Sequence, residues 1–111
     1  MEVKKIIVDE RYVTKFIVEE NGEVLGRAFL YFIYNGLHEE PYGLLEDVFV
    51  NGEHRGRKIG TTLVKAIIQE AKDHQCYKLI GTSRHSRPRV HEFYTSLGFK
   101  NHGLEFRIDF N

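Results

Sequence analysis

Basic residues and glycines gather in a short segment near the middle of the chain. The segment holds Arg55, Arg57 and Lys58 together with Gly56 and Gly60. An alternating, strand-like run precedes it, and apolar residues at three- and four-residue spacings follow it. A helix that begins after such a turn has unpaired N–H groups and a partial positive charge in its first turn. The segment therefore predicts a phosphate-binding junction between a strand and a helix.

The same segment resembles the pyrophosphate-binding signature of the GNAT superfamily of acetyl-CoA-dependent N-acetyltransferases, Arg/Gln-x-x-Gly-x-Gly/Ala. Arg55 and Gly60 match this signature, whereas Lys58 stands where its first glycine is usual. Glycine would let the backbone approach the phosphates without a Cβ atom. The resemblance implies acetyl-CoA as acyl donor, with its pyrophosphate held by Arg55, Gly56, Arg57, Lys58, Ile59, Gly60 and Thr61.

A second stretch, residues 90–99, resembles the Phe-Tyr-x-x-x-Gly-Phe segment of the same family. One helix and one strand fit between the two motifs, and the resemblance covers roughly residues 44–100. It implies that Tyr94 meets the sulfur of coenzyme A and assists the thiolate leaving group as a general acid. The alternative is a tyrosine that only packs beside Val90 and Leu97 at helical spacing.

The strand that leads into the basic segment carries further implied contacts. In the family this strand splays from the next parallel strand, and the pantetheine arm lies between them, which implies backbone contacts from Val48, Phe49 and Val50. An N–H near Val48 would polarise the acetyl carbonyl, because a preoriented donor stabilises the negative charge that develops there. Glu46 is the candidate base for the acceptor amine. A solvent-facing Glu46 is the alternative, and Asp47 faces the other side unless a bulge intervenes.

Hydrophobic periodicity outlines the elements that position these residues. Asn21-Gly22 between two β-rich runs predicts a hairpin. The pattern favours strands over residues 3–8, 12–19, 24–34, 45–50, 78–82 and 104–110, and helices over 59–74 and from Ser86 to Gly98. The order β-β-β-β-α-β-α-β predicts an α+β fold, a mixed and mainly antiparallel sheet flanked by helices. We expect a single GNAT-like domain over residues 1–111.

One part of the family pattern is missing. The family carries one or two helices between its first two strands, where they help to form the acceptor pocket, but here only residues 9–11 separate the strands. The loop over residues 35–42, with Glu39 and Glu40, is one source of a replacement wall. A second subunit is the other, because strand 28–34 is apolar on both faces. We therefore expect a homodimer.

Composition excludes several classes of protein. Sixteen basic and sixteen acidic residues give no net charge, whereas a nucleic-acid binder usually shows a basic excess. One cysteine excludes an internal disulfide and fits a reducing compartment. The six histidines lack metal-ligand spacing, so we expect no metal. The absence of a signal peptide and of a long apolar run predicts a cytoplasmic protein that does not cross a membrane.

The resulting prediction is an N-acetyltransferase that transfers the acetyl group of acetyl-CoA directly to a primary amine of a small molecule or peptide. The Leu45-Glu46-Asp47 segment resembles the diamine N-acetyltransferases. The alternatives are a transferase that uses another acyl group and a non-catalytic acyl-CoA-binding module. An RNA-binding module would rest on two basic clusters, within residues 54–58 and 84–89, but no KH loop or RNP motif is present.

Overall fold

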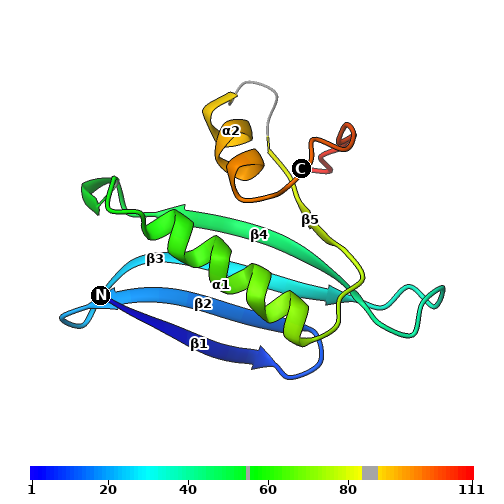
Figure 1. Ribbon diagram of the computed structural model, residues 1–111, viewed down its shortest axis with the longest axis horizontal. Coiled ribbons are helices and arrows are strands. Elements are labelled where there is room, and N and C mark those ends of the chain that lie inside the picture. Colours follow the sequence, from blue (N-terminus) through cyan, green and yellow to red (C-terminus); the bar gives the residue numbers. More distant parts are fainter. Residues whose placement is uncertain (55, 84–87) are drawn as a thin grey trace. The chain divides into compact units, whose positions relative to one another are not determined.

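The computed structural model describes residues 1–54, 56–83 and 88–111. Five strands form one sheet in the order β1-β2-β3-β4-β5 (Figure 1). The first four strands pair antiparallel, and β5 pairs parallel to β4. The predicted mixed, mainly antiparallel sheet is therefore confirmed. The elements are β1 (Glu2–Asp9), β2 (Val13–Glu20), β3 (Glu23–Ile33), β4 (Tyr42–Val50), the 3₁₀ helix η1 (Gly52–His54), α1 (Ile59–Asp73), β5 (Leu79–Gly81) and α2 (Pro88–Ser96).

The turn between β2 and β3 is the one that the Asn-Gly pair predicts. Asn21 and Gly22 have φ angles of 53° and 81°. Two consecutive left-handed residues match the twist of the flanking strands, which makes this a favoured hairpin turn. The turn fixes the register that places Phe16 opposite Ala28 and Lys15 opposite Phe29.

Helix α1 packs across β2, β3 and β4 on one face of the sheet (Figure 1). Its apolar stripe, spaced by three and four residues, is fully buried at Leu63, Val64 and Ile67. Ala28 and Leu30 of β3 are equally buried, and a Cβ atom added to Gly26 would meet Ile59 and Leu63. The core therefore lies between α1 and this face of the sheet.

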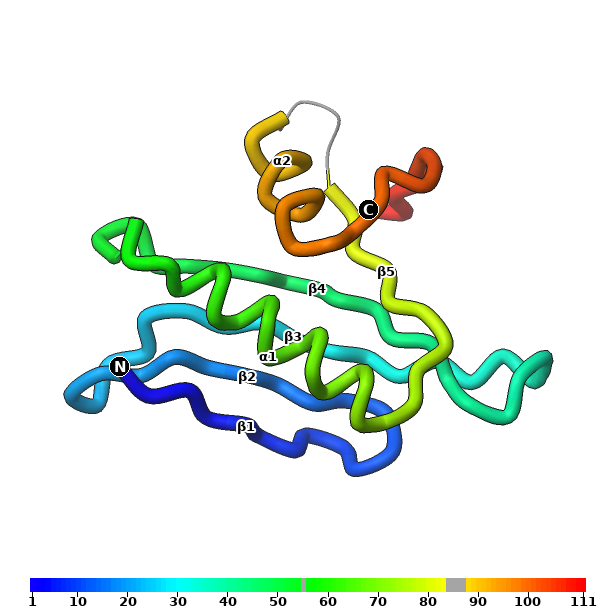
Figure 2. Tube along the Cα trace, viewed as in Figure 1, coloured from blue at the N-terminus to red at the C-terminus, as the bar shows by residue number. Residues whose placement is uncertain are grey.

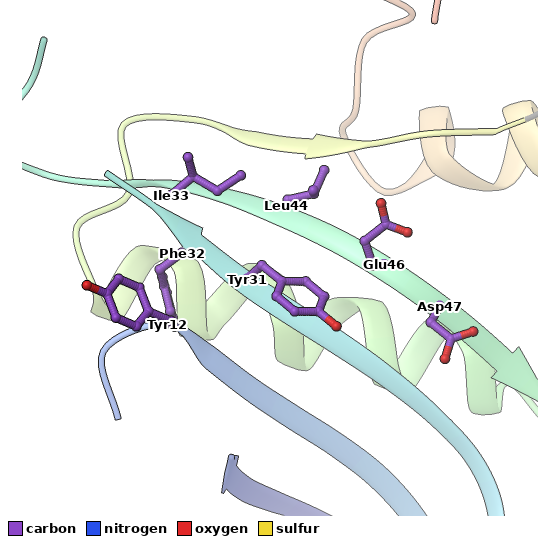
Figure 3. Close-up of a pocket in the computed structure, with 7 residues that line it drawn as sticks. All are labelled: Tyr12, Tyr31, Phe32, Ile33, Leu44, Glu46 and Asp47. Atoms are coloured by element: carbon purple, nitrogen blue, oxygen red, sulfur yellow. The ribbon is translucent and has the colours of Figure 1, made fainter. Parts of the chain in front are cut away.

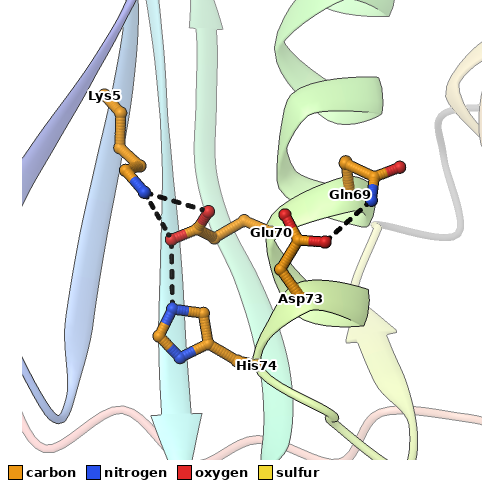
Figure 4. A network of polar contacts seen from close by, with 5 residues as sticks. All are labelled: Lys5, Gln69, Glu70, Asp73 and His74. Atoms are coloured by element: carbon orange, nitrogen blue, oxygen red, sulfur yellow. Dashed lines mark hydrogen bonds and ion pairs between the residues drawn. The ribbon is translucent and has the colours of Figure 1, made fainter.

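A buried carboxylate joins the edge strand to the helix. Glu70 of α1 accepts hydrogen bonds from Lys5 Nζ of β1 at 3.4 Å to each carboxylate oxygen (Figure 4). Its Oε2 atom also lies 3.2 Å from His74 Nε2, and the His74 ring packs on Phe32 with centroids 4.4 Å apart. Because a buried charge needs partners, this network lets α1 bury Glu70 and hold β1.

Residues 1–81 and 82–111 form two compact units, and each is described by itself. The single domain over the whole chain stays a prediction. In the second unit α2 ends before Gly98, which has a φ of 100°, and the Phe99 N–H donates to the Tyr94 carbonyl at 3.1 Å. Left-handed glycine is the usual end of a helix, so the predicted end is confirmed. Ser86, the predicted cap, lies outside the described residues. Neither described helix has the length and apolar character that a bilayer crossing requires.

The prediction of a last strand over residues 104–110 is wrong, because this segment contains no strand. Its alternating apolar residues are Leu104, Phe106, Ile108 and Phe110, with 66–92% of each exposed. Alternation favours a strand only where a neighbouring strand supplies hydrogen bonds and a packed face. Neither is present for this segment among the described residues.

Candidate functional site

The junction between η1 and α1 has two left-handed residues. Gly56 has a φ of 89°, and Lys58, the N-cap of α1, has a φ of 61°. The second value explains why glycine is usual at this position in the GNAT signature, because a side chain disfavours left-handed backbone. The Lys58 carbonyl accepts hydrogen bonds from the Thr62 N–H at 3.0 Å and the Thr62 hydroxyl at 2.9 Å. Arg55, predicted to contact the cofactor, lies outside the described residues.

The first turn of α1 is open to an anion. The N–H groups of Ile59, Gly60 and Thr61 precede the first intrahelical donor and have no partner in the helix ladder. Acidic side chains commonly occupy this position because they complement the helix dipole, but the first turn of α1 has none. The junction therefore brings together amides without a partner in the helix ladder and a positive dipole end, the two features that bind phosphate.

The two described cations of the loop have different surroundings. Arg57 donates to Glu20 Oε2 at 2.6 Å and to His54 Nδ1 at 3.0 Å. The hydrogen bond from Arg57 holds the pKa of Glu20 below its ordinary value. Lys58 is exposed, and no carboxylate within the described ranges pairs with it. Arg57 thus anchors the loop through its side chain, whereas the Lys58 ammonium is available to an anion.

His54, Glu23 and Glu53 place one potential metal-ligand atom each within 4.8 Å of one another. The spacing of these residues along the sequence gives no hint of this cluster. Arg57 can only donate, so His54 Nδ1 accepts and the ring proton is on Nε2, which lies 3.5 Å from Glu23 Oε1. His54 thus lies between Arg57 and Glu23, but its Nε2 atom has no hydrogen-bond partner among the described residues.

Strand β4 contains a bulge at the predicted catalytic region. Glu46 pairs with Phe29 and Phe49 pairs with Arg27, so two residues of β4 face one residue of β3. Asp47, with a φ of 56°, and Val48 are these two residues. A bulge leaves its extra residue outside the hydrogen-bond ladder and re-aims the side chains next to it. The role of a backbone N–H near Val48 stays a prediction.

The bulge brings Glu46 and Asp47 into one shallow pocket, although the two would face opposite sides of a regular strand. The pocket has a volume of about 490 Å³ (Figure 3). Arg27 donates to both Asp47 oxygens, at 3.1 Å and 3.4 Å. Glu46 is exposed and forms no ion pair with a described residue. Of the two carboxylates, Glu46 is the one available to an amine. The lining residues are Tyr12, Tyr31, Phe32, Ile33, Leu44, Glu46 and Asp47.

Parallel pairing between β4 and β5 ends early. Leu45 opposite Gly81 is the last pair, so Glu46 to Val50 continue without a β5 partner. Val48 and Val50 are half-buried. Phe49 is exposed, and the Arg27 guanidinium carbon lies over its ring, 4.8 Å from the ring centroid. The segment predicted to contact pantetheine is thus the part of β4 whose edge toward β5 lacks a strand partner in the described chain.

Tyr94 lies on α2 in the second unit. Its ring packs against Phe93 and Phe99, with centroids 5.4 Å and 5.3 Å apart. The ring is half-buried. These contacts orient the side chain within its own unit, and its contact with the coenzyme sulfur stays a prediction.

The aromatic residues that line the pocket were not predicted as site residues from the sequence. Tyr31 lies beside the two carboxylates (Figure 3). Phe29 stacks on Tyr31 with ring centroids 6.0 Å apart. The available signal was the strand over residues 28–34, apolar on both faces, which we interpreted as a partner interface. The loop with Glu39 and Glu40 contributes no residue to the described lining, and its His38 stacks on Tyr77 at 3.9 Å.

Known proteins are similar in sequence to this chain over most of its length. A sequence model of the acetyltransferase (GNAT) family matches residues 3–99. The glucosamine 6-phosphate N-acetyltransferase of Trypanosoma brucei brucei is 33% identical over 103 residues, which cover 87% of this chain and 65% of that protein. The chain thus spans less than two thirds of the length of this relative.

Solved structures share the fold. An acetyltransferase from Trypanosoma brucei superposes with a TM-score of 0.79 at 25% identity, over 90% of this chain and 70% of that one. Glucosamine-6-phosphate N-acetyltransferase from Arabidopsis thaliana gives a TM-score of 0.82 at 22% identity, over 91% and 69% of the two chains. The second similarity is one of fold alone. On the family match and the shared fold, this chain belongs to the acetyltransferase (GNAT) family.

Proposed function

We propose that this chain carries the acetyl-CoA site and the reacting groups of an N-acetyltransferase that acts on a primary amine of a small molecule. The observation that carries the proposal is the order in which three structural features follow one another from β4 to α1. The β4 bulge at Asp47 and Val48 is followed by the left-handed turn at Lys58 and the open first turn of α1. A thioester is an acyl donor to amines, and a bound acetyl-CoA would supply that chemistry here.

The loop fits the phosphate end of such a donor. The amides of Gly60 and Thr61 point from the first turn of α1, where the helix dipole favours negative charge. The Lys58 ammonium adds a cation that no described carboxylate neutralises. The Lys58 backbone already has the left-handed conformation of the glycine that it replaces, so its side chain does not prevent the loop from forming.

Three groups would handle the protons and the developing charge. Glu46 accepts a proton from the acceptor ammonium and leaves a nucleophilic amine. The N–H near Val48 donates to the acetyl oxygen, which becomes more negative as the amine attacks. Tyr94 donates its phenolic proton to the sulfur as the carbon–sulfur bond breaks. Products are the N-acetylated amine and the free thiol.

Glucosamine 6-phosphate is the first acceptor to test, because the Trypanosoma relative has this name. The diamine likeness around Glu46 makes spermidine the second. Turnover of acetyl-CoA on both amines and on unphosphorylated glucosamine would identify the acceptor class. Turnover with propionyl-CoA in place of acetyl-CoA would test the acyl group. Calorimetry that finds acetyl-CoA binding without turnover on any amine would favour the acyl-CoA-binding module.

Thr61→Glu is a sharp variant for the cofactor site. A carboxylate in the first turn complements the dipole of α1, so the fold should be at least as stable. The same carboxylate repels a pyrophosphate. We expect weaker acetyl-CoA binding with an unchanged melting temperature. Equal affinity in both proteins, or no binding of acetyl-CoA at millimolar concentration by the unmodified chain, would overturn the proposed cofactor site.

We also propose a homodimer, in which the second subunit supplies the wall of the acceptor pocket that the family's helices between the first two strands would otherwise form. Support comes from β1, which lies at the edge of the described sheet beside β2 and exposes Val3, Ile7 and Val8. An edge of this kind usually has a covering element. Light scattering should give a dimer mass at assay concentration. A monomer mass with activity per chain unchanged on dilution would defeat the proposal.

A further inference from the structure

The face of the sheet opposite α1, called here the second face, carries its own set of side chains. Ala28 and Leu30 point toward the helix, so the alternate residues Phe29 and Tyr31 point to the second face. A Cβ atom on Gly43 would meet Leu30 and Cys76, which places Gly43 on the helix side. Leu44 and Glu46 of β4 therefore belong to the second face.

Three residues of the second face form a row across neighbouring strands. Lys15 of β2 is opposite Phe29 of β3, and Phe29 is opposite Glu46 of β4. The Lys15 ammonium lies 5.3 Å from the centroid of the Phe29 ring, which confirms that both are on the same side. Since neighbouring strands are about 4.8 Å apart, the backbones of Lys15 and Glu46 are about 10 Å apart.

The two ends of this row have opposite, unneutralised charges. Two other cations of the second face are paired: Arg27 with Asp47, and Lys4 with Glu19 at 3.2 Å. Neither Lys15 nor Glu46 has an ion-pair partner in the part of the chain that the structure describes. Between them lies the aromatic surface of Phe29 and Tyr31, which stack on each other. The row is thus complementary to a molecule with a cation at one end, an anion at the other and a flat apolar middle.

We propose that the Lys15–Phe29–Glu46 row is the acceptor platform, and that it selects primary amines with a phosphate about one hexose ring away from the nitrogen. Glu46 receives the ammonium, Lys15 binds the phosphate, and the ring of the acceptor lies on Phe29 and Tyr31. This inference rests on the proposed function and adds the second charge that the acceptor must have. Lys15 is here a specificity residue, because it is far from the nitrogen that reacts.

Lys15→Met tests the platform, because methionine keeps an apolar stem over Phe29 and removes only the charge. Steady-state kinetics with glucosamine 6-phosphate and glucosamine are the measurement. We expect kcat/KM for the phosphorylated amine to fall at least about tenfold, the effect of losing one charge-assisted hydrogen bond. The value for glucosamine and the KM for acetyl-CoA should not change. Lys4→Met, which removes a cation already paired with Glu19, is the matched control and should affect neither acceptor.

Equal losses on both acceptors, or no loss on either, would overturn the platform while leaving the N-acetyltransferase intact. If the unmodified chain acetylates neither of these amines nor spermidine, the proposed function fails, and binding still tests the platform. Amide NMR titration with glucosamine 6-phosphate should then shift Lys15 and Phe29, and glucosamine should shift them far less. Titrations that leave these signals in place would refute the platform independently of catalysis.

Discussion

Arg57 Nη2 and Glu20 Oε2 lie 2.6 Å apart and join the loop before α1, residues 56–58, to the tip of the β2–β3 hairpin. Figure 2 shows that the turn between β2 and β3 and the junction between β4 and α1 lie at the same end of the sheet. The ion pair between Arg57 and Glu20 therefore connects two segments that are distant in sequence but close in space. His54 lies beside this pair, where its Nδ1 atom accepts from Arg57 at 3.0 Å. The hairpin therefore positions the loop in which the cofactor phosphates are proposed to bind.

Glu20→Gln should give a pH-dependent loss of thermal stability. The folded-state pKa of Glu20 is below its ordinary value of 4.5, first because Arg57 donates to it. The stabilisation is therefore fully present above pH 4.5 and disappears as the pH falls through the lower folded-state pKa. We expect the variant to melt below the unmodified protein at pH 7 and level with it near the acid end. Glu10→Gln, an exposed carboxylate without a described ion pair, is the control. A gap of equal size at both pH values would contradict the prediction.

Lys58→Gly should stabilise the fold by about 0.5–1 kcal/mol. A left-handed residue with a side chain is strained by roughly 1–2 kcal/mol, and the extra freedom of glycine in the unfolded chain offsets part of the gain. Urea unfolding gives the difference in free energy. Lys58→Ala keeps the φ of 61° strained and should not be stabilised. Comparable stability of the two variants would mean that the backbone strain is small.

Most of the fold follows from local patterns. Asn21-Gly22 specifies its turn, and the stripe at Leu63, Val64 and Ile67 specifies α1, because in both cases neighbouring residues decide the conformation. The segment over residues 104–110 has an equally clear alternation and is no strand. A strand depends on a partner from elsewhere in the chain, and alternation does not supply one.

The candidate site divides in the same way. The position of the loop from Gly56 to Gly60, in which phosphate binding is proposed, was predictable because its glycines and cations are contiguous. The pairing of Asp47 with Arg27, and the row from Lys15 to Glu46, were not, since they depend on the register of three strands and on one bulge. The sequence predicts Glu46 as the base and places Asp47 on the other side of the strand unless a bulge intervenes. The bulge is present, and the ion pair between Asp47 and Arg27 leaves Glu46 as the carboxylate without a described ion-pair partner.

Gly26→Ala should destabilise the fold by about 1–3 kcal/mol, the usual effect of overpacking a core. The added Cβ atom would lie 2.9 Å from Ile59 Cγ2 and 2.9 Å from the Phe49 carbonyl oxygen, and that oxygen belongs to backbone that cannot rotate away. Denaturant unfolding measures the change. Gly52→Ala, whose Cβ would meet nothing within 4 Å, should stay within about 0.5 kcal/mol. A neutral Gly26→Ala would show that α1 packs less closely on β3 than described.

Glu46→Gln should alter the pH profile of acetyl transfer to an alkylamine. Such an amine is protonated at neutral pH, so a base is needed there and becomes dispensable where the free amine is plentiful. We expect kcat/KM to fall about 10²–10⁴-fold near pH 7 and much less at alkaline pH. Glu40→Gln, outside the pocket lining, should leave the profile unchanged. A loss of the same size at every pH would instead assign Glu46 to acceptor binding.

Tyr94→Phe removes a single hydroxyl and keeps the ring between Phe93 and Phe99, so the second unit should remain folded. If the hydroxyl protonates the departing sulfur, kcat should fall about 10²–10⁴-fold, the usual contribution of a general acid. The calorimetric Kd for acetyl-CoA should stay the same, because the phosphate contacts are on α1. Tyr34→Phe removes a hydroxyl from an exposed ring outside the pocket lining and should leave kcat unaltered. An undiminished kcat in Tyr94→Phe would make Tyr94 a packing residue, and the thiolate would then leave without a proton from this side chain.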